Sequence, residues 1–475
     1  MATTASTETH TAAAARGDET PAAAVARVRA TFASGRSRDI AWRLRQLAGI
    51  ERLLAQEESV ISAAVHTDLG RPAFTAWMSE IVPSRIEVQY ARKHLRRWMR
   101  PRRTRMPMTM QPGRASTVFE PLGVVGIVGP WNYPFYLTFG PLIGAFAAGN
   151  VAVIKPSEHA PACAETLADL LPRYLDRDAV AVVQGDASAT QDLIAQSLDH
   201  VFFTGGPEIG KAIMAAAAPH LTPVTLELGG KCPAVVTADA NLEVTARRLV
   251  MTKLMNSGQT CVAPDYVLVE RSVQSRLVDL LTAEVRAQSA EDPQPGLPIV
   301  NERQHARLAA LLERTSGEVR RPLTGDAQPG TLAATLVLDP APDDAVMEDE
   351  IFGPILPIVG VGSLDEAFAY VNRGPKPLAA YIFTTVKAKL DAMVRAVSAG
   401  AVVQNQVAMH VTIPQLPFGG VGRSGMGAYH GRWGFETFSH RKSVISKPAK
   451  PDPRLMYPPY GERAQRIMRR IMGGS

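Results

Sequence analysis

Short apolar segments alternate with segments of helical periodicity between residues 124 and 228. The apolar runs are rich in β-branched residues and lie at Val124–Val128, Val151–Ile154, Val180–Gln184, Val201–Phe203 and Val224–Leu226. Helical segments separate them near 135–148, 160–174, 188–197 and 208–218. Strands that alternate with helices form a parallel sheet covered on both faces, and ligands bind beyond the carboxyl ends of its strands. The pattern therefore predicts a doubly wound α/β domain with a site in the loops after these strands.

A second alternation of the same kind follows the pair Gly229-Gly230. It predicts strands at 234–236, 265–269, 355–359, 379–383 and 401–404, and helices at 241–255, 273–288, 302–314, 364–371 and 387–398. Residues 318–330 contain turn-forming residues without clear periodicity, so we expect no regular element there. Because 475 residues exceed what one hydrophobic core usually holds, the two alternations predict two α/β domains.

The segments that flank the two alternations have simpler patterns. Residues 1–20 are rich in alanine and threonine and predict a disordered leader, and residues 21–97 carry apolar residues at helical spacing. Residues 104–119 predict a hairpin around a Pro-Gly turn, and residues 436–446 an extended strand. Residues 461–472 place isoleucines and methionines opposite arginines, which predicts a basic amphipathic helix that docks on its own protein or a partner rather than a membrane.

The composition narrows the possible classes of protein. Three cysteines form no disulfide framework and indicate a reducing compartment, so we expect a cytoplasmic protein. Cysteines and histidines lack the spacing of metal ligands, and no run of about eighteen apolar residues predicts a transmembrane helix. Basic residues crowd positions 91–105 with one interleaved aromatic, which favours a solvated helix end or a subunit contact over nucleic acid.

The segment Asn256–Tyr266 carries Cys261 between a predicted helix and a predicted strand. A loop held by rigid elements on both sides can present a thiol to a cleft. Free cysteine is also among the most buried residue types. The local sequence therefore leaves two interpretations of Cys261 open, a small core residue and a nucleophile.

Two loops after predicted strands carry polar side chains in place of a G-x-G-x-x-G fingerprint. Asn132 can donate a hydrogen bond to a developing oxyanion, or it can cap the following helix. Lys155 and Glu158 suit recognition of nucleotide hydroxyls or phosphates. This loop also suits a helix start, with Ser157 as its N-cap and Glu158 at the positive helix end, and the two roles are compatible.

Glycines and a carboxylate occupy the loops after the fourth and fifth predicted strands. Gly205, Gly206 and Gly210 lie where a strand gives way to a helix, and backbone N–H groups at such a position bind anions. Glu227 lies at a strand end before two glycines, which suits a general base. A salt bridge at the domain junction is the alternative for Glu227.

Five motifs, in this order along the chain, resemble those of the NAD(P)-dependent aldehyde dehydrogenase superfamily. They are Phe203-Thr-Gly-Gly206, Leu226-Glu-Leu-Gly-Gly-Lys231, Gly258-Gln-Thr-Cys261, Glu350-Ile-Phe-Gly-Pro354 and Pro417-Phe-Gly-Gly420. The separation of Glu227 from Cys261 is also similar to that of the family. The segments Cys261–Tyr266 and Leu416–Gly431 look like the class-3 branch, and the tail Arg454–Gly461 resembles, more loosely, that of coniferyl aldehyde dehydrogenases.

The resemblance implies an α/β fold with two doubly wound domains, a Rossmann-like cofactor domain and a catalytic domain, and a small β oligomerisation element. It also implies a homodimer, with a tetramer as the alternative. The implied cofactor domain consists of N-terminal helices at 21–103, an NAD(P)-binding domain at 120–229 and a return to the cofactor domain at 413–435. The implied catalytic domain is 230–412, and the implied oligomerisation element is a hairpin at 104–119 with a strand at 436–447. A leader at 1–20 and a tail at 448–475 complete the chain.

Carried over to the matching positions, the resemblance implies three catalytic residues. Cys261 is the nucleophile, Asn132 forms an oxyanion hole with the Cys261 backbone N–H, and Glu227 is the general base. The implied cofactor contacts are Lys155, Glu158, Thr204, Gly205, Gly206, Gly210, Leu228, Glu350 and Phe352. Glycine at position 206, where many family members have serine, leaves NADP possible, whereas Glu158 would repel a 2′-phosphate and favours NAD.

The implied reaction oxidises an aldehyde to its carboxylic acid. A thiolate whose pKa is lowered attacks the aldehyde, hydride leaves to NAD(P)+, and water activated by Glu227 hydrolyses the thioester. The class-3 branch implies a hydrophobic substrate, aromatic such as coniferaldehyde, with medium- or long-chain fatty aldehydes as the alternative. A non-catalytic relative is a remote alternative, because all three catalytic residues are present. We expect Cys163, Cys232 and His410 to be structural residues.

Overall fold

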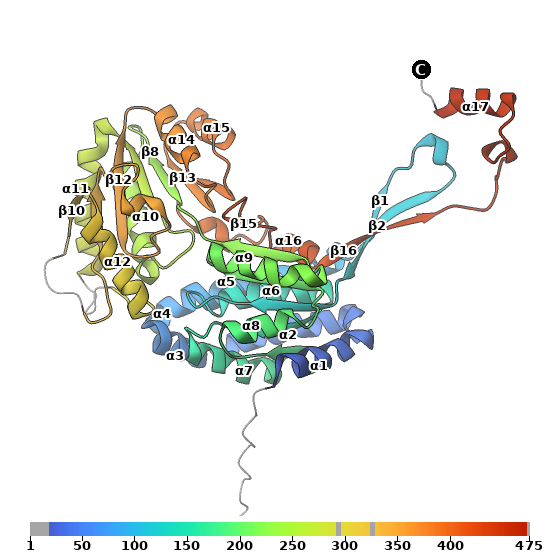
Figure 1. Cartoon of the computed structure of the whole chain (residues 1–475), viewed down its shortest axis with the longest axis horizontal. Helices are drawn as coiled ribbons and strands as arrows, with labels where there is room; N and C mark the ends of the chain where they lie inside the picture. Colours follow the sequence, from blue (N-terminus) through green and yellow to red (C-terminus); the bar gives the residue numbers. More distant parts are fainter. Residues whose placement is uncertain (1–18, 291–295, 324–327, 473–475) are drawn as a thin grey trace, which may run out of the picture.

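The computed structural model describes residues 19–290, 296–323 and 328–472, which form two α/β lobes and an extended arm (Figure 1). The first half of the chain builds most of the lower lobe in that view, and the arm projects to the right and ends near the C-terminus. Nearly all of the leader predicted at 1–20 lies outside the described residues. At its end, Thr20 accepts a hydrogen bond from the Ala23 N–H and caps the first helix.

The first sheet has six strands in the order β15-β7-β6-β3-β4-β5. Their bounds are β3 Val124–Val128, β4 Val151–Lys155, β5 Val180–Val182, β6 His200–Gly205, β7 Val224–Leu228 and β15 Gly425–Met426. All five strands predicted for this region are confirmed, and they run parallel. Strand β15 pairs antiparallel with β7, so the chain returns to the first lobe after completing the second.

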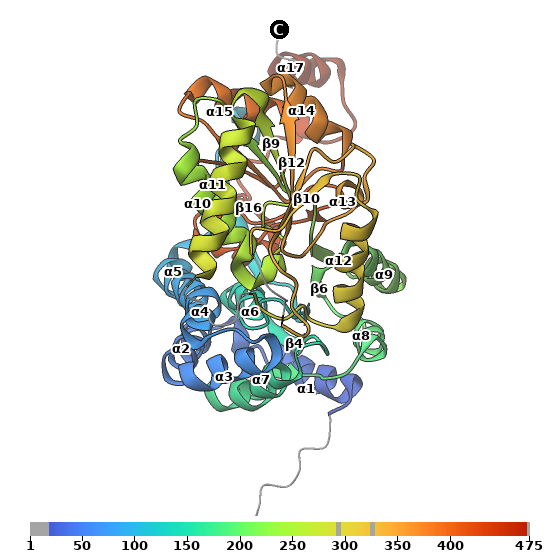
Figure 2. The same cartoon turned by 90° about the vertical axis from the view of Figure 1, so that its left-hand side faces the viewer.

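Helices from the first half of the chain surround this sheet (Figure 2), and α16 from near the C-terminus packs on α6. They are α1 Pro21–Ala33, α2 Ile40–Gln56, α3 Glu58–Leu69, α4 Ala73–Ala76, α5 Val82–Trp98, α6 Tyr136–Ala148, α7 Pro161–Tyr174, α8 Ala187–Ile194, α9 Pro207–Ala217 and α16 Gly431–Thr437. Asp39 caps α2, and Gly70 ends α3 in the left-handed conformation, so local signals divide the N-terminal helical region. Because α1 contacts β4 and α2 contacts α6, this region belongs to the first lobe.

The second sheet has seven strands in the order β10-β11-β12-β9-β8-β13-β14. Their bounds are β8 Pro233–Val236, β9 Tyr266–Glu270, β10 Glu318–Arg320, β11 Thr335–Leu338, β12 Ile355–Val361, β13 Ala379–Phe383 and β14 Ala401–Gln404. The five strands predicted here are confirmed. The expectation of no regular element at 318–330 is wrong at β10, because a three-residue edge strand is too short to show a period and forms by pairing with β11.

Helices of the second lobe flank this sheet. They are α10 Leu242–Leu254, α11 Arg271–Ser289, α12 Glu302–Arg314, α13 Ala345–Glu348, α14 Leu364–Arg373 and α15 Lys387–Ala396. Short 3-10 or π segments are η1 Arg36–Arg38, η2 Trp77–Ile81, η3 Met108–Met110, η4 Ala218–His220, η5 Met255–Gly258, η6 Met409–Thr412 and η7 Arg454–Met456. Segment η5 leads from α10 to Cys261, which therefore lies between a helix and a strand as predicted.

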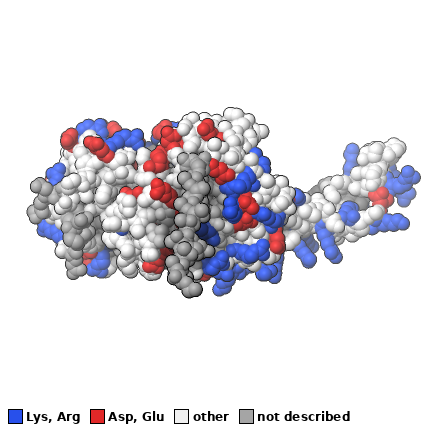
Figure 3. Space-filling view, turned by 90° about the horizontal axis from the view of Figure 1, so that it is seen from below, with Lys and Arg blue, Asp and Glu red and all other residues white. Residues whose placement is uncertain are grey.

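The arm is an antiparallel sheet in the order β1-β2-β16, with bounds β1 Arg102–Thr104, β2 Arg114–Pro121 and β16 Ser439–Ser446. The hairpin is slightly longer than 104–119, and β16 pairs with β2 along its whole length. The basic amphipathic helix predicted near the C-terminus is α17 Glu462–Met472, and none of its residues is buried. Lys and Arg side chains stand along the arm (Figure 3). Within the described residues, no helix is both long and apolar enough to cross a bilayer.

Candidate active site

A cavity of about 490 Å³ opens between the two lobes. The first sheet contributes the loops after β3, β4, β6 and β7, and the second sheet contributes the loops before β9 and β12. The cavity thus joins the carboxyl edge of one sheet to the amino edge of the other. The predicted site residues that line it are Asn132, Lys155, Glu158, Thr204, Gly205, Gly206, Glu227, Leu228, Cys261, Glu350 and Phe352.

Gly210 has a different position from the other predicted cofactor contacts. A Cβ atom at this position would lie 2.8 Å from a methyl carbon of Leu228. Gly210 therefore lets α9 pack closely on β7 and is not among the residues that line the cavity, so its role as a cofactor contact stays a prediction. The start of α9 does lie at the cavity, because its N-cap is Gly206, and a Cβ atom at that position would point into open space.

Three consecutive residues in the left-handed conformation turn the chain from α10 toward Cys261. The angle φ is +52° at Asn256, +51° at Ser257 and +74° at Gly258. Gly258 is required, because a Cβ atom there would overlap the carbonyl oxygen of Gly353. At a residue other than glycine, such a conformation costs on the order of 1–3 kcal/mol and persists only where the surrounding contacts enforce it.

Hydrogen bonds from both lobes enforce this turn. Asn256 Nδ2 donates to the carbonyl oxygens of Asn132 and Gln259, each at 3.2 Å. Ser257 Oγ donates to the Leu297 carbonyl at 2.7 Å. The loop that carries Cys261 is therefore held against the first lobe and against the segment before α12, which gives the thiol a defined position.

The Cys261 side chain is partly exposed, whereas the other two cysteines are buried. Burial raises the pKa of the Cys261 thiol to about 12, with further contributions from the charges of Glu350 and Glu227. The backbone N–H groups of Cys261 and Val262 act in the opposite direction. In this arrangement the shift is opposite to the expected lowering, because burial disfavours the thiolate and the carboxylates of Glu350 and Glu227 add to that effect.

Asn132 lies in the loop between β3 and α6, and its side chain is directed at the Cys261 loop. Its Nδ2 donates to the Gln259 carbonyl at 3.1 Å. The alternative that Asn132 caps α6 is wrong, because Glu80 accepts hydrogen bonds from the N–H groups of Phe135 and Tyr136 at that helix start. Since an amide nitrogen carries two donors, the contact with Gln259 leaves one for an oxygen atom beside Cys261.

A buried ion pair from the N-terminal helical region supports the Asn132 loop. Arg71 Nη1 and Glu80 Oε1 are 2.8 Å apart, and neither side chain is exposed. Arg71 also donates to the Asn132 carbonyl, and its guanidinium carbon lies 4.6 Å from the centre of the Tyr133 ring. The Tyr133 hydroxyl in turn lies 2.7 Å from Thr260 Oγ1. Our sequence reasoning missed this pair, because charged residues in an amphipathic helical region normally face solvent.

Glu227 lies at the end of β7 and is 3% exposed. Neither of its carboxylate oxygens has a hydrogen-bond partner within the described residues. Burial raises the pKa of Glu227 well above its ordinary value. The alternative of a salt bridge is therefore wrong for the part of the chain that the structure describes. A carboxyl group whose pKa is raised accepts a proton more readily than an ordinary one, as a general base requires.

Lys155 and Glu158 form an ion pair at the cavity, with Nζ and Oε2 2.8 Å apart. Burial opposes ionisation of Glu158, but the hydrogen bond from Lys155 holds its pKa below the ordinary value. The expected helix start with Ser157 as N-cap is wrong, because the N-cap of α7 is Ala160. At the start of that helix, Asp68 accepts hydrogen bonds from the backbone N–H groups of Ala162 and Cys163.

Glu350 and Phe352 lie on the turn before β12. Burial, followed by the charge of Asp265, raises the pKa of Glu350 to about 8. Gly229 makes room for this carboxylate, because a Cβ atom there would overlap it. Phe352 has a φ of +52°, and its ring meets Trp131 edge-to-face with the ring centres 5.6 Å apart.

The remaining cysteines and His410 are packed in the core, as expected. Cys232 is fully buried and donates its S–H group to the Cys261 carbonyl at 3.4 Å. Cys163 is fully buried on α7. His410 packs against Phe418 with ring centres 5.8 Å apart, and burial lowers its pKa to about 4, so it is neutral at physiological pH.

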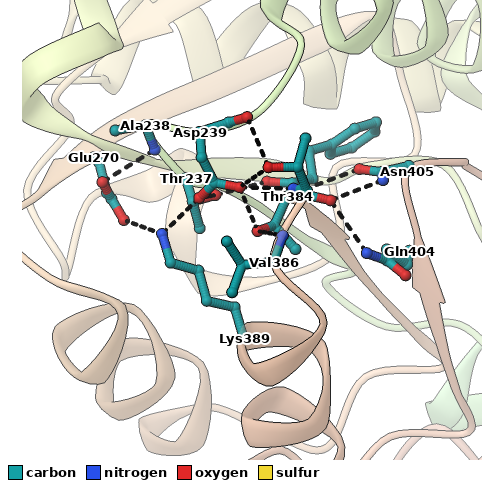
Figure 4. Close-up of polar contacts among 11 residues, drawn as sticks. Thr237, Ala238, Asp239, Glu270, Thr384, Val386, Lys389, Gln404 and Asn405 are labelled. Carbon is teal, nitrogen blue, oxygen red and sulfur yellow. Dashed lines mark hydrogen bonds and ion pairs between the residues drawn. The ribbon is translucent and has the colours of Figure 1, made fainter.

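At the carboxyl edge of the second sheet, a different carboxylate is fully paired (Figure 4). Asp239 follows β8, and its Oδ1 accepts from Lys389 at 2.6 Å and from Thr237 at 2.8 Å. Its Oδ2 accepts from the hydroxyl of Thr384 at 2.8 Å and from the backbone N–H of Thr385 at 2.6 Å. Burial opposes ionisation, but these partners hold the pKa of Asp239 well below its ordinary value. The network ties the ends of β8 and β13 together.

Comparisons with known proteins agree with these features. The profile of the aldehyde dehydrogenase family matches residues 2–444. The "aldehyde dehydrogenase, dimeric NADP-preferring" of Rattus norvegicus is 42% identical over 426 residues, covering 89% of this chain and 94% of that protein. The "aldehyde dehydrogenase family 3 member A2" of Mus musculus is 42% identical over 447 residues, covering 92% and 91%.

A solved structure of Staphylococcus aureus AldH in its substrate-bound state has the same fold. The TM-score is 0.89 at 38% sequence identity, and the match covers 94% of this chain and 98% of that chain. Together with the family 3 relative, this match confirms the predicted fold class and the resemblance to the class-3 branch.

Proposed function

Since the chain belongs to the aldehyde dehydrogenase family, we propose that Cys261, Glu227 and Asn132 carry out its oxidation of an aldehyde with NAD(P)+. The observation that carries this assignment is their meeting in one cavity. A partly exposed thiol, a buried carboxyl group without a partner in the described residues, and an amide donor all line it. Such a set provides a nucleophile, a base and an oxyanion donor.

Cys261 attacks the aldehyde carbon through sulfur, and the carbonyl oxygen becomes the oxyanion of a thiohemiacetal. Because the pKa of this thiol is raised to about 12, the attack is coupled to loss of the thiol proton to solvent water. The Asn132 amide and the Cys261 backbone N–H are the donors for the oxyanion. One well-placed donor contributes roughly 3–4 kcal/mol to transition-state stabilisation.

Glu227 acts in the hydrolytic half of the reaction. NAD(P)+ bound in the cavity would supply the hydride acceptor, and loss of hydride from the substrate carbon would leave a thioester on Cys261. Glu227 removes a proton from the water that attacks the thioester, which releases the carboxylic acid and returns the thiol. A residue in the role of a base favours hydrolysis over transfer of the acyl group to coenzyme A.

The carboxyl edge of the first sheet suits the phosphate end of the cofactor. Gly205 ends β6 and Gly206 is the N-cap of α9 at the cavity, and backbone N–H groups at such a helix start suit an anion. Lys155 and Glu158 suit the hydroxyls of the adenosine ribose. The ionised Glu158 would repel a 2′-phosphate, so we propose NAD as the preferred cofactor and NADP as a possible one.

The amino edge of the second sheet suits the nicotinamide end. Glu350 is assigned to the nicotinamide ribose, and Phe352 lies beside the proposed nicotinamide position. Thr204 and Leu228 line the cavity between the two ends.

The proposed substrate is a hydrophobic aldehyde, aromatic such as coniferaldehyde. Trp131, Leu137 and Phe418 line the cavity together with Asn132 and Cys261, and they provide aromatic and aliphatic surface for such a molecule. A medium- or long-chain fatty aldehyde is the second candidate, because the same surface binds alkyl chains.

A steady-state panel distinguishes these substrates. Purified protein is assayed with coniferaldehyde, benzaldehyde, octanal and decanal, each with NAD+ and with NADP+. We expect the highest kcat/KM for an aromatic aldehyde with NAD+. Higher values for octanal or decanal would instead establish the fatty aldehyde assignment, and higher values with NADP+ would reverse the proposed cofactor preference.

A homodimer assembled through the arm is the proposed state of the protein. Strand β16 forms one edge of the arm sheet, and an edge strand offers backbone groups for pairing with another chain. Three free cysteines suit a reducing compartment, so the cytoplasm is the proposed location. Light scattering coupled to size-exclusion chromatography would distinguish a dimer from a tetramer.

A further inference from the structure

One buried ion pair joins three loops around the cavity. Lys231 precedes β8, Asp265 precedes β9 and Ile351 precedes β12, and these three strands are neighbours in the second sheet. Lys231 Nζ and Asp265 Oδ2 are 2.6 Å apart, and their side chains are 12% and 4% exposed. The pair therefore connects the loop after Glu227 with the loop after Cys261.

Both members of the pair also bind the turn that carries Glu350 and Phe352. Lys231 Nζ donates to the carbonyl oxygens of Val346 and Asp349 at 2.8 and 2.9 Å. An ammonium group has three N–H donors, and Lys231 thus uses all of them. Asp265 Oδ1 accepts from the backbone N–H of Ile351 at 3.0 Å.

The backbone held by these contacts is strained. Phe352 has a φ of +52°, a left-handed conformation that persists only where surrounding contacts enforce it. Arg307 Nη2 adds a hydrogen bond to the Ile351 carbonyl at 2.5 Å. Ile351 is consequently held through its N–H and its C=O, and the side chains on either side of it, Glu350 and Phe352, line the cavity.

We propose that Lys231 and Asp265 are positioning residues that hold Glu350 and Phe352 in the geometry that binds the nicotinamide end of the cofactor. This inference rests on the proposed cofactor contacts of Glu350 and Phe352. Neither member of the pair is among the described residues that line the cavity, so both act through the turn. Loss of one member leaves a buried charge without its partner, which moves the turn.

The test compares cofactor binding with a reaction that needs no cofactor. Lys231→Met, Asp265→Asn and the double variant are titrated with NAD+ by the quenching of tryptophan fluorescence. Hydrolysis of p-nitrophenyl acetate, which acylates Cys261 and needs only water for release, is measured in parallel. We expect NAD+ affinity to fall by about 10- to 100-fold in each variant, as for a misplacement of about 1 Å, while ester hydrolysis stays within about twofold of wild type.

A matched ion pair in the same lobe provides the control. Lys389 Nζ and Asp239 Oδ1 are also 2.6 Å apart, but they lie at the carboxyl edge of the second sheet. Lys389→Met should leave NAD+ affinity unchanged. Equal losses of NAD+ affinity and of ester hydrolysis in Lys231→Met would indicate general disruption and overturn the inference, as would unchanged NAD+ affinity. Asp265→Asn, which keeps an acceptor for the Ile351 N–H, provides the same readout if Lys231→Met does not fold.

A further variant separates this inference from the proposed function. Glu350→Gln changes the proposed cofactor contact itself and leaves the Lys231–Asp265 pair intact. If Glu350→Gln leaves NAD+ affinity unchanged, the proposed contact is wrong, and the inference that rests on it falls as well. If Glu350→Gln weakens NAD+ binding and Lys231→Met does not, only the positioning role is wrong.

Discussion

The carboxyl edges of the two sheets each hold a buried or half-buried carboxylate, and their surroundings are opposite. Glu227, at the end of β7, has no hydrogen-bond partner within the described residues, and burial raises its pKa. Asp239, just after β8, has an ammonium group, hydroxyls and a backbone N–H as partners, and its pKa is lowered. Within the described residues, the carboxylate oxygens of Glu227 thus accept no hydrogen bond, whereas both oxygens of Asp239 accept several.

This difference shows that a position at the carboxyl edge of a parallel sheet does not by itself make a site. The cavity lies at this edge of the first sheet, whereas the Asp239 network joins the ends of two strands at this edge of the second. The second sheet presents its chemistry from the opposite edge, where Cys261 and Glu350 precede β9 and β12. Unused bonding capacity on a buried carboxylate is the feature that indicates chemistry, because structural carboxylates are normally paired.

The largest expected effect is at the nucleophile. Cys261→Ala removes the sulfur that forms the thiohemiacetal, so we expect no NAD(P)H formation with any aldehyde in a spectrophotometric assay. Cys163→Ala serves as the control, because that cysteine is fully buried in the first lobe; its turnover should resemble that of wild type. Unchanged turnover in Cys261→Ala would disprove the mechanism.

The next effect is at the unpaired carboxylate. Glu227→Gln keeps the shape of the side chain but cannot accept a proton from water, so we expect acylation to persist while release of the acid stalls. Stopped-flow absorbance should show a stoichiometric burst of NADH followed by steady-state turnover reduced by about 10²- to 10⁴-fold. A normal steady state would remove Glu227 from the role of base.

Substitution of the paired carboxylate, Asp239, should lower the stability of the protein and leave its catalysis unchanged. Asp239→Asn removes the charge that Lys389 and the threonines face, so we expect a loss of about 1.5–3 kcal/mol in the free energy of unfolding in urea. The folded variant should keep wild-type kcat/KM. Because the folded pKa of Asp239 is lowered, its contribution is complete above its unfolded pKa of about 3.9 and is lost as the pH falls toward the folded value. A stability difference that does not shrink in acid would contradict this account.

The smallest expected effect is the pH dependence of stability that Glu227 causes. Its sign should be opposite to that of the pH dependence caused by Asp239. Its folded pKa is raised, so wild type should lose stability relative to Glu227→Gln as the pH rises above the unfolded pKa of about 4.3. Thermal unfolding of both proteins between about pH 5 and 8 should show a gap in Tm that widens with pH, by about 1 °C for each kcal/mol. A constant gap would mean that burial does not perturb this carboxyl group.

The secondary structure was largely predictable, because it depends on local periodicity. Both sets of five predicted strands lie within a few residues of their places in the structure, whereas the three-residue edge strand β10 and the neighbouring β11 were not predicted. The roles of single polar residues were harder to predict than the positions of helices and strands. Asn132 and Ser157 both suited helix caps by sequence, but Glu80 and Asp68, which are distant in sequence, bind those helix starts instead.

The sequence by itself determined the two α/β alternations, the motifs of the family and eleven of the residues that line the cavity. Only the tertiary structure decided the electrostatic surroundings of these residues. Glu227 has no hydrogen-bond partner within the described residues, the pKa of Cys261 is raised, and the ion pair of Lys231 and Asp265 binds the turn that carries Glu350. The physical reason is that periodicity and turn chemistry act between neighbours in the chain. Burial, ion pairing and the direction of a pKa shift depend on groups that come together only when the two lobes pack.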